Sequence, residues 1–492
     1  MKFDVVVVGG GGSGLAAAIA ASDAGASVLV LEKNEILGGT TRLSVGSISA
    51  TRTQLQMKAG IQDSAEEHFE DIIKFAGPAL ALRDNVRLRR VLVENVTETV
   101  AWLVDMGVCF FGPMPEPPHR KPRMHNVLPN SRSYIYHLER EARRKGVTIR
   151  TSAPVVDMVI REGGACGVRA YMEGHEVSIN ARRGVILATG DFTNSSELKK
   201  RFVPNLTSVD AINPSSTGDG HLMAERSGGE IVNGDLMYGQ LRFVAPPATS
   251  VFLKIPPNKA LTLIMKLAIE RAPAWILRPF LLSFVTTFLA PELAIFDKGA
   301  VLVNKIGERF CDETDRPHLR VAKQPDKIAF MVFDELLADR MSSWPNYIST
   351  APGVAYAYLQ DYRRNRKDLY HEADNLSALS ERLAMPAGKL QETVDEYNRN
   401  VGKYQRGKRP ILKHGRFVAL GPVRGWSVLG DGGLRVSENH EVLRHDGSRI
   451  VGLFAVGSAG QGGLLLEGHG HHLGWAFTSG RRAGRFAATE RS

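Results

Sequence analysis

Three glycines near the start of the chain have the spacing of a phosphate-binding turn. Gly9, Gly11 and Gly14 form a GxGxxG pattern between a run of four valines and an alanine-rich segment. Without side chains the backbone can approach a pyrophosphate, whose charge the following helix N-terminus stabilises. A second apolar run, 27–31, ends in Glu32, a carboxylate at the distance expected for binding ribose hydroxyls. The segment therefore predicts a dinucleotide-binding unit.

The elements that must position this turn can be read from the same segment. Residues 5–8 are β-branched with no polar alternation, which is typical of a parallel strand buried on both faces. Residues 15–24 predict a helix that ends at Gly25, and 27–31 predict the next strand. The fold class expected is therefore α/β, with a Rossmann-like unit at the beginning of the chain.

Composition excludes several classes of protein. The chain has 492 residues, 43% of them hydrophobic and 23% charged, which excludes disordered, collagen-like and small disulfide-rich proteins. The net charge is +10, but the basic residues are spread along the chain without interleaved aromatic residues, so no nucleic-acid partner is expected.

Cysteine usage and the chain start predict a location. Cys109, Cys166 and Cys311 are far apart and form no CxxC pair, which favours a reducing compartment. An apolar strand begins at once, leaving no room for a signal peptide. The longest uncharged apolar run, 279–291, is shorter than the roughly 20 residues that span a bilayer. We expect a cytoplasmic protein, with peripheral membrane contact as a further expectation.

Beyond Glu32 the chain resembles flavoproteins. The segment Leu37–Thr41 contains Gly38-Gly39 and is similar to the second glycine pair that contacts FAD in disulfide-reductase-like and succinate dehydrogenase-like proteins. Residues 183–190 resemble the strand that returns the chain to the FAD domain, and 452–458 resemble the strand beneath the flavin ribityl chain. These resemblances imply FAD rather than NAD.

Over almost its whole length the chain resembles the family of fumarate reductases, succinate dehydrogenases and 3-ketosteroid Δ1-dehydrogenases. The resemblance rests on residues 60–64, 217–220, 307–313, 392–398 and 432–436, in family order. It implies an FAD-binding domain that is split in sequence, with an inserted α+β capping or catalytic domain. The expected division is 1–243 and 421–492 for the FAD-binding domain and 244–420 for the capping domain.

The turn and the resemblance together predict the FAD contacts. They are Gly9, Gly11, Gly12, Ser13, Gly14, Glu32, Lys33, Gly39, Thr40, Thr41, Gly46, Val156, Thr189, Gly190, Asp219, Gly457, Ser458, His471, His472 and Leu473. Thr40 falls where succinate dehydrogenases tether FAD through a histidine, so the cofactor is expected to be non-covalent. A second dinucleotide unit is missing from the sequence, which implies an external electron donor or acceptor: a quinone, a reduced flavin, oxygen or a carrier protein.

Chemistry in this family is hydride transfer at a carbon near an electron-withdrawing carbonyl, with a proton moved by a side chain. The resemblance places the substrate-binding histidines of fumarate reductases on Leu429 and Arg242. It places their substrate-binding arginine on Glu467 and the ketosteroid enzymes' tyrosine on Leu466. Gly470 matches the glycine whose N–H supports the carbonyl. Some of the residues that bind a dicarboxylate in fumarate reductases are therefore replaced in this sequence.

Five residues are the candidate catalytic groups: Arg316, Glu467, Tyr238, Arg242 and His469. Arg316 lies one position before the place of the catalytic arginine in fumarate reductases and is the first candidate for proton transfer or carbonyl polarisation; an ordinary surface arginine is the alternative. The histidines of the segment 467–472 are expected to contact flavin or substrate, and no metal site is expected because its glycines offer no rigid ligand scaffold.

The function expected is that of an FAD-dependent oxidoreductase acting on a C–C bond next to a carbonyl. An apolar series over 261–296 favours a bulky hydrophobic ketone, such as a steroid-like or aromatic enone, and either a buried cap core or a membrane contact. One alternative is a fumarate reductase-like enzyme acting on an unsaturated carboxylic acid. Another is a non-catalytic lipid-binding protein on the same fold. Reaction direction is left open.

Overall fold

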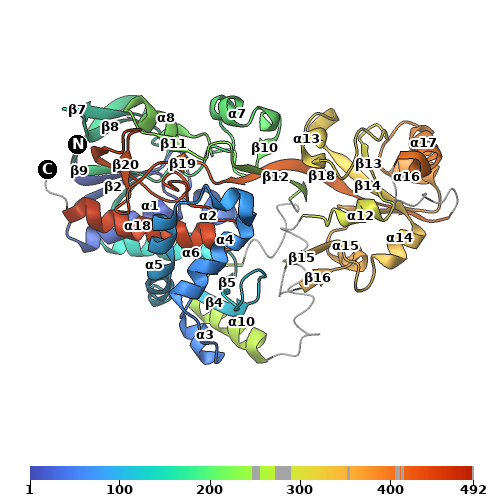
Figure 1. Cartoon of the computed structure of the whole chain (residues 1–492), viewed down its shortest axis with the longest axis horizontal. Helices are drawn as coiled ribbons and strands as arrows, with labels where there is room; N and C mark the ends of the chain where they lie inside the picture. The colour runs from blue at the N-terminus through green and yellow to red at the C-terminus, as the bar shows by residue number, and fades with distance from the viewer. Residues whose placement is uncertain (246–254, 272–289, 352–354, 405–410, 412–414, 490–492) are drawn as a thin grey trace.

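Two lobes lie side by side along the long axis of the molecule (Figure 1). The structure is a computed structural model, and it describes residues 1–245, 255–271, 290–351, 355–404, 411 and 415–489. Both chain termini belong to the first lobe. The long strand β18 (Phe417–Gly430) runs from one lobe to the other and pairs with β12 (Met237–Phe243), so the lobes are joined by continuous strands.

The first lobe is built on a sheet in the order β20-β21-β9-β1-β2-β6. The strands are β1 (Lys2–Val8), β2 (Val28–Leu31), β6 (Thr148–Arg150), β9 (His175–Leu187), β20 (Glu441–Leu443) and β21 (Arg449–Ala455). Neighbours from β21 to β6 are parallel. Val5, Val6 and Val7 are fully buried, as the absence of polar alternation predicts. The expected Rossmann-like α/β fold is confirmed.

Several smaller elements complete this lobe. An antiparallel extension is formed by β7 (Val155–Arg161) and β8 (Gly164–Met172) against β9. A three-stranded sheet contains β3 (Ser47–Ser49), β5 (Met124–Leu128) and β4 (Cys109–Met114). The strands β11 (Ile231–Val232) and β19 (Gly433–Leu434) form an antiparallel pair. The surrounding helices are α2 (Gly39–Leu43), α3 (Gln54–Lys58), α4 (Ala65–Ala81), α5 (Val86–Asp105), α6 (Arg132–Arg144), α7 (Ser196–Phe202), η1 (Pro204–Leu206) and α8 (Asp219–Arg226).

The first and last helices of the chain touch backbone to backbone. Helix α1 (Gly12–Asp23) follows the glycine turn, and α18 (His471–Thr489) lies along it. A Cβ on Gly480 would lie 2.3 Å from the carbonyl oxygen of Ser13, and a Cβ on Gly484 would lie 2.2 Å from that of Ala17. Positions i and i+4 share one helix face, so the two glycines form the contact surface. Helix α18 therefore packs directly against α1 and completes the core of this lobe.

The second lobe has a sheet in the order β10-β18-β14-β13, with β12 and β17 also paired to β18. Its strands besides β12 and β18 are β10 (Asp210–Ala211), β13 (Val301–Asn304), β14 (Ala329–Asp334) and β17 (Tyr370–Ala373). The hairpin β15 (Ser349–Ala351) and β16 (Ala355–Ala357) lies beside it. Its helices are α12 (Ala294–Asp297), α13 (Pro317–Val321), η2 (Pro325–Lys327), α14 (Glu335–Arg340), α15 (Leu359–Asn365), α16 (Leu376–Arg382) and α17 (Lys389–Tyr404).

The second lobe contains both helices and strands, as expected for the capping domain. The expected boundaries of that domain, residues 244–420, remain a prediction. One helix of the interval 244–420 lies elsewhere: α10 (Lys259–Arg271) packs against β4 of the first lobe. Much of the apolar series over 261–296 lies outside the described residues. Among the helices of the described part, none is long and apolar enough to cross a bilayer.

We expect Gly480→Val to destabilise the protein by about 1–3 kcal/mol or more, because a side chain there collides with the α1 backbone. Thermal unfolding of the purified variant measures this effect. The matched control is Gly474→Ala on the same helix, where the added Cβ would meet Val96 Cγ2 at 3.4 Å, an ordinary contact. Equal melting temperatures for the two variants would contradict the backbone contact.

Candidate active site

The three glycines of the turn have different tasks. Gly9 has a φ of +108°, and a Cβ there would lie 2.4 Å from the carbonyl oxygen of Ala188 on the neighbouring segment. A Cβ on Gly14 would lie 2.0 Å from the oxygen of Gly9, so this glycine lets α1 pack on the turn. A Cβ on Gly11 would meet only the oxygen of Gly38, at 3.9 Å. Gly11 therefore keeps open a space that the protein itself does not fill.

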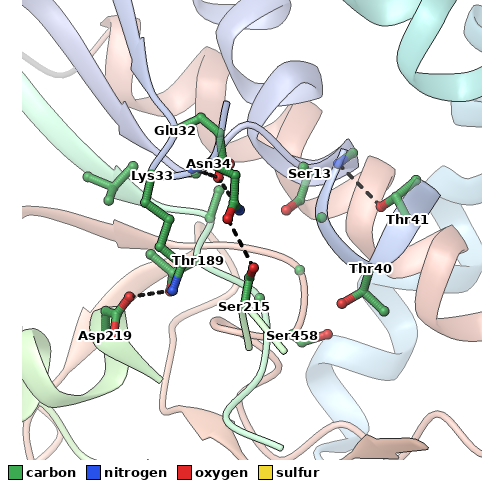
Figure 2. A pocket seen from close by; sticks show the side chains of 18 of the residues that line it. Ser13, Glu32, Lys33, Asn34, Thr40, Thr41, Thr189, Ser215, Asp219 and Ser458 are labelled. Carbon is green, nitrogen blue, oxygen red and sulfur yellow. Dashed lines mark hydrogen bonds and ion pairs between the residues drawn. The ribbon is translucent and has the colours of Figure 1, made fainter. Parts of the chain in front are cut away.

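That space belongs to a cleft of about 840 Å³, its open mouth included. Figure 2 gives a close view of it. Most of the expected FAD contacts line the cleft: Gly9, Gly11, Gly12, Ser13, Glu32, Lys33, Gly39, Thr40, Thr41, Thr189, Gly190, Asp219, Gly457 and Ser458. The sequence analysis did not single out six other lining residues: Asn34, Val155, Asn213, Ser215, Met223 and Ala476. These residues follow strand ends or lie far along the chain, where no motif marks them.

Glu32 is held at the end of β2 by backbone donors. Its Oε2 accepts a hydrogen bond from the Gly10 N–H at 2.8 Å, and its Oε1 accepts from the Asn34 N–H at 2.9 Å. The residue is buried, and its side chain lies at the cleft wall (Figure 2). A fixed carboxylate beside the glycine turn is the group that binds ribose hydroxyls in dinucleotide sites.

Polar side chains on the other side of the cleft are also paired. Lys33 Nζ lies 2.8 Å from Asp219 Oδ2 at the start of α8, and Figure 2 shows this pair across the cleft. Thr41 Oγ1 accepts a hydrogen bond from the Gly12 N–H at 3.2 Å. Thr40 Oγ1 accepts from Asn213 Nδ2 at 2.9 Å. These pairs hold the second glycine segment against the turn.

The residues present fit FAD. An N-terminus of a helix without side chains at Gly11 and Gly12 suits the pyrophosphate, and Glu32 suits a ribose. When bound, FAD supplies hydride chemistry. None of the described residues lining this cleft is a histidine, cysteine or tyrosine, and Thr40 occupies the position expected for a histidine tether.

Six of the expected FAD contacts lie outside the cleft lining. Gly14 supports the turn, and Gly46 accepts a hydrogen bond from Tyr134 through its carbonyl at 2.7 Å. Val155 lines the cleft whereas Val156 is 39% exposed, because neighbouring strand residues point to opposite faces. The remaining three are His471, His472 and Leu473, which begin α18.

A second group of polar residues lies where β18 ends. Asp431 is fully buried, and its Oδ2 accepts a hydrogen bond from the Tyr238 hydroxyl at 3.2 Å. Its Oδ1 accepts from Gln461 Nε2 at 2.5 Å and lies 3.5 Å from His472 Nε2. Burial raises the pKa of Asp431 to about 6, and burial together with the Asp431 charge raises the pKa of Tyr238. Both groups thus hold their protons more tightly than usual.

Glu467 and His469 belong to the segment between this group and α18, which we call the histidine loop (residues 467–472). The loop meets a proline-rich segment, residues 113–123, at two places. His469 Nδ1 contacts Glu116 Oε1, which also accepts a hydrogen bond from the His469 backbone N–H at 2.9 Å. His471 Nε2 lies 3.1 Å from His119 Nε2. Sequence reasoning missed Glu116, His119 and Asp431, because these contacts join residues far apart in the chain.

Three buried histidines, His68, His119 and His471, have ring nitrogens within 4.8 Å of one another, as a metal site requires. The hydrogen bonds argue against a metal ion. Arg123 always donates, so the 3.0 Å contact makes His119 Nδ1 an acceptor and places the proton on Nε2. That proton faces His471 Nε2, while His471 Nδ1 donates to the Glu467 carbonyl at 2.6 Å. If His119 Nε2 bound a metal ion, the ring proton would be on Nδ1, where it would face the Arg123 N–H, and two donors would oppose each other. The chain of contacts instead fixes the histidine loop.

The two arginines among the candidates occupy different settings. Arg242 lies on β12 and its Nε donates to Gln240 Oε1 at 3.0 Å; within the described part of the chain, no carboxylate lies at ion-pair distance. Burial lowers the pKa of Arg242 to about 10. Arg316 is exposed at the N-terminus of α13, 3.3 Å from Asp315. The structure brings Tyr238, Glu467 and His469 together around one loop, but Arg316 makes none of the contacts that join them.

Comparison with known proteins supports the assignment of the cleft to FAD. The chain matches the family model described as "FAD binding domain" over residues 4–246 and 283–465. It is 28% identical over 507 residues to the fumarate reductase (cytochrome) of Shewanella frigidimarina, covering 99% of this chain and 77% of the relative. It spans only 44% of the length of another relative, the NADH:fumarate oxidoreductase of Klebsiella pneumoniae, at 27% identity and 93% of this chain.

Solved structures agree as well. The open conformation of a flavocytochrome c3 fumarate reductase matches with a TM-score of 0.75 at 23% identity, covering 100% of this chain and 78% of that one. The 3-ketosteroid-Δ4-(5α)-dehydrogenase from Rhodococcus jostii RHA1 in complex with 4-androstene-3,17-dione matches with a TM-score of 0.60 at 26% identity, covering 99% and 97%.

The fold and the cleft define an FAD-binding flavoprotein with a capping lobe. The chain belongs to the FAD binding domain family that includes fumarate reductases, and it is a flavin-dependent oxidoreductase acting on CH–CH groups. The expected family, fold class, enzyme class and FAD cofactor are therefore confirmed.

We expect Gly11→Val to fold but to be purified without yellow colour. Gly11 has a φ of −78° and a ψ of −175°, which valine adopts readily, and its Cβ would point into the open cleft. The side chain then occupies the space of the pyrophosphate. Flavin absorbance and thermal unfolding of the apoprotein measure the two effects. A variant that binds FAD as the wild type does would contradict the proposed pyrophosphate position.

We expect Asp431→Asn to stabilise the protein more at pH 8 than at pH 5. The pKa of Asp431 in the folded protein is about 6, above the ordinary value of 3.8. The folded wild type therefore loses stability as pH rises through 6 and Asp431 becomes charged, whereas asparagine stays neutral at both pH values. This difference corresponds to a contribution on the order of 3 kcal/mol. Melting temperatures at both pH values test it, with exposed Asp374→Asn as the control. A pH-independent gain would contradict the assignment.

Proposed function

We propose that this enzyme adds or removes hydrogen across a C–C bond next to the carbonyl of a bulky, weakly polar substrate. The observation that carries the proposal is the presence of two leucines close to Tyr238 and its partner Asp431. Leu429 pairs with Tyr238 across the two strands, and Leu466 is fully buried next to Asp431. Neither leucine can bind a carboxylate, so this part of the site favours an apolar substrate body.

A helix outside the site supports the same substrate class. In α10, Leu263, Ile264 and Leu267 are exposed by 53%, 64% and 38%. They lie on one helix face, and Lys259 and Arg271 stand at its ends. An exposed apolar face with flanking cations suits a membrane surface or the passage of a hydrophobic molecule. Peripheral membrane contact is part of this proposal, as is a cytoplasmic location.

We assign proton handling and carbonyl binding to Tyr238, Glu467 and His469, with Arg316 as the contribution of the capping lobe. Arg316 has φ +45° and ψ +58° although it is not glycine and precedes Pro317. A left-handed residue of this kind costs about 1 kcal/mol or more, and such strain is often found at functional sites. The electron partner is an external quinone, reduced flavin, oxygen or carrier protein.

A second candidate substrate is an unsaturated carboxylic acid. Arg242 favours it, because this partly buried cation is bonded only to neutral Gln240 in the described part of the chain. A carboxylate would supply the missing counter-charge. The alternative of a non-catalytic lipid carrier is set aside, because the chain belongs to a family of flavin enzymes.

A panel of substrates distinguishes the two candidates. Under anaerobic conditions the bound flavin is monitored photometrically while hydrophobic enones, saturated ketones, fumarate and succinate are added to reduced or oxidised enzyme. We expect a hydrophobic enone or ketone to react fastest. Fumarate or succinate reacting faster than every hydrophobic carbonyl compound would reverse the ranking.

Two variants sharpen this test. If the substrate is a ketone, Arg242→Gln leaves its KM nearly unchanged, whereas for a carboxylate substrate the KM rises steeply. Arg316→Ala should lower turnover by about 10²-fold if Arg316 moves the proton. Near-full activity of Arg316→Ala would move that role to Tyr238, His469 or Glu467.

A further inference from the structure

The backbone around His469 is fixed more firmly than that of an ordinary surface loop. Gly468 and Gly470 each have a φ of +92°. A Cβ on Gly468 would lie 2.8 Å from the Phe75 ring, and a Cβ on Gly470 would lie 2.4 Å from the Ser49 backbone nitrogen. The chain on both sides of His469 is therefore packed against neighbouring elements, and only glycine fits there.

His469 itself has three anchors. Its backbone N–H donates to Glu116 Oε1 at 2.9 Å, and its carbonyl accepts from Ser49 Oγ at 2.7 Å. Its Nδ1 contacts the same Glu116 oxygen. An ionised carboxylate only accepts, so Nδ1 carries the proton. The ring is 43% exposed, and no side chain of the described residues is hydrogen-bonded to Nε2.

Burial and two flanking prolines restrict the position of Glu116. Its side chain is 5% exposed and stands between Pro115 and Pro117, which restrict the backbone. In the described chain its buried Oε2 has no hydrogen-bond partner. Through Oε1 this buried carboxylate contacts both the backbone N–H and the ring of His469, and it is the counter-charge for a ring that carries protons on both nitrogens. The exposed pair His445 and Glu230 differs, because His445 is 94% exposed and Glu230 also binds Arg435.

Two other donors near the loop are already bonded, whereas His472 Nε2 is buried and has no hydrogen-bond partner among the described residues. The Tyr238 hydroxyl donates to Asp431, and His471 Nδ1 donates to the Glu467 carbonyl. His472 faces Asp431. His469 thus has a side chain that is 43% exposed and held through Nδ1, while its Nε2 makes no hydrogen bond to the described residues.

We propose that Glu116 and His469 form a carbonyl-polarising dyad, in which His469 Nε2–H donates a hydrogen bond to the carbonyl oxygen of the substrate and Glu116 positions the ring. This inference rests on the proposed function. A preorganised, charge-assisted donor of this kind lowers the energy of negative charge that develops on the oxygen as the neighbouring C–H bonds change. His469 is then a catalytic residue and Glu116 a positioning residue.

Infrared spectroscopy of a bound carbonyl tests the dyad without turnover. The probe is a cyclic enone labelled with ¹³C at the carbonyl, added to the oxidised FAD-loaded enzyme. We expect its C=O stretch to move to lower frequency on binding to the wild type. The shift should be lost in His469→Gln and reduced in Glu116→Gln. Glu116→Gln keeps an oxygen in the place of Oε1, which both the His469 backbone N–H and Nδ1–H contact, but it removes the negative charge that faces the His469 ring.

Kinetics give the second readout. We expect kcat to fall by about 10²-fold in His469→Gln, as for removal of one oxyanion donor. Glu116→Gln should lower kcat by roughly 10-fold, with a smaller change in KM and unchanged flavin absorbance. The matched controls are His445→Gln and Glu230→Gln, which alter the exposed pair and should leave kcat and the C=O stretch unchanged.

The two proposals fail in different ways. Wild-type turnover of ketones with a C=O stretch that is the same in wild type, His469→Gln and Glu116→Gln overturns the dyad and leaves the proposed function standing. A wild-type enzyme that reacts with no carbonyl compound overturns both. Histidine ¹⁵N NMR of the holoenzyme adds an independent check: a His469 signal, assigned with His469→Gln, that lacks a proton on either Nδ1 or Nε2 overturns the dyad whatever the substrate.

Discussion

The backbone contact between α1 and α18 is the constraint on which the site depends. The carbonyls of Ser13 and Ala17 lie where side chains on Gly480 and Gly484 would be. The Gly457 N–H donates to Ser479 Oγ at 2.9 Å, which joins the strand end before the histidine loop to the same helix. Because helices are stiff, this contact sets both helix N-termini at once. One N-terminus faces the FAD cleft, and the other carries the histidine loop.

A buried ionic group supports the loop from the opposite side. Arg123 is fully buried between Asp63 and Asp71, at 2.7 and 2.5 Å, and its other N–H reaches His119. His119 then meets His471. Breaking a pair of this kind by removing one partner leaves an uncompensated buried charge, so the group tolerates little change. The loop is therefore held by the helix contact on one side and by this ionic group on the other.

Sequence reasoning was most successful where function depends on local spacing. The glycine turn, Glu32 and the second glycine segment are each contained in a short stretch, and they lie together in the cleft as expected. The sequence analysis named Val156, whereas Val155 lines the cleft. Because neighbouring strand residues point to opposite faces, a shift of one residue changes which side chain faces the cleft.

The rest of the site depends on long-range contacts. Glu116 meets His469 and Asp431 meets Tyr238 across hundreds of residues, and no spacing rule connects such positions. Burial is likewise a property of the whole fold, so the raised pKa of Asp431 had no signal in the Gly430–Gly433 segment. The exposure of Arg316 also follows from the placement of α13 on the second lobe rather than from its neighbours in sequence.

The distance between the two ends of the site bears on substrate size. Tyr238 and Arg242 are separated by four residues of β12, which corresponds to about 13 Å of extended strand. Tyr238 belongs to the group around Asp431 and the histidine loop, whereas Arg242 stands near the other end of β12. A four-carbon dicarboxylate is shorter than this backbone separation. The extended, weakly polar carbonyl compound that we propose as the substrate would instead reach along Leu429 from a carbonyl group at the histidine loop.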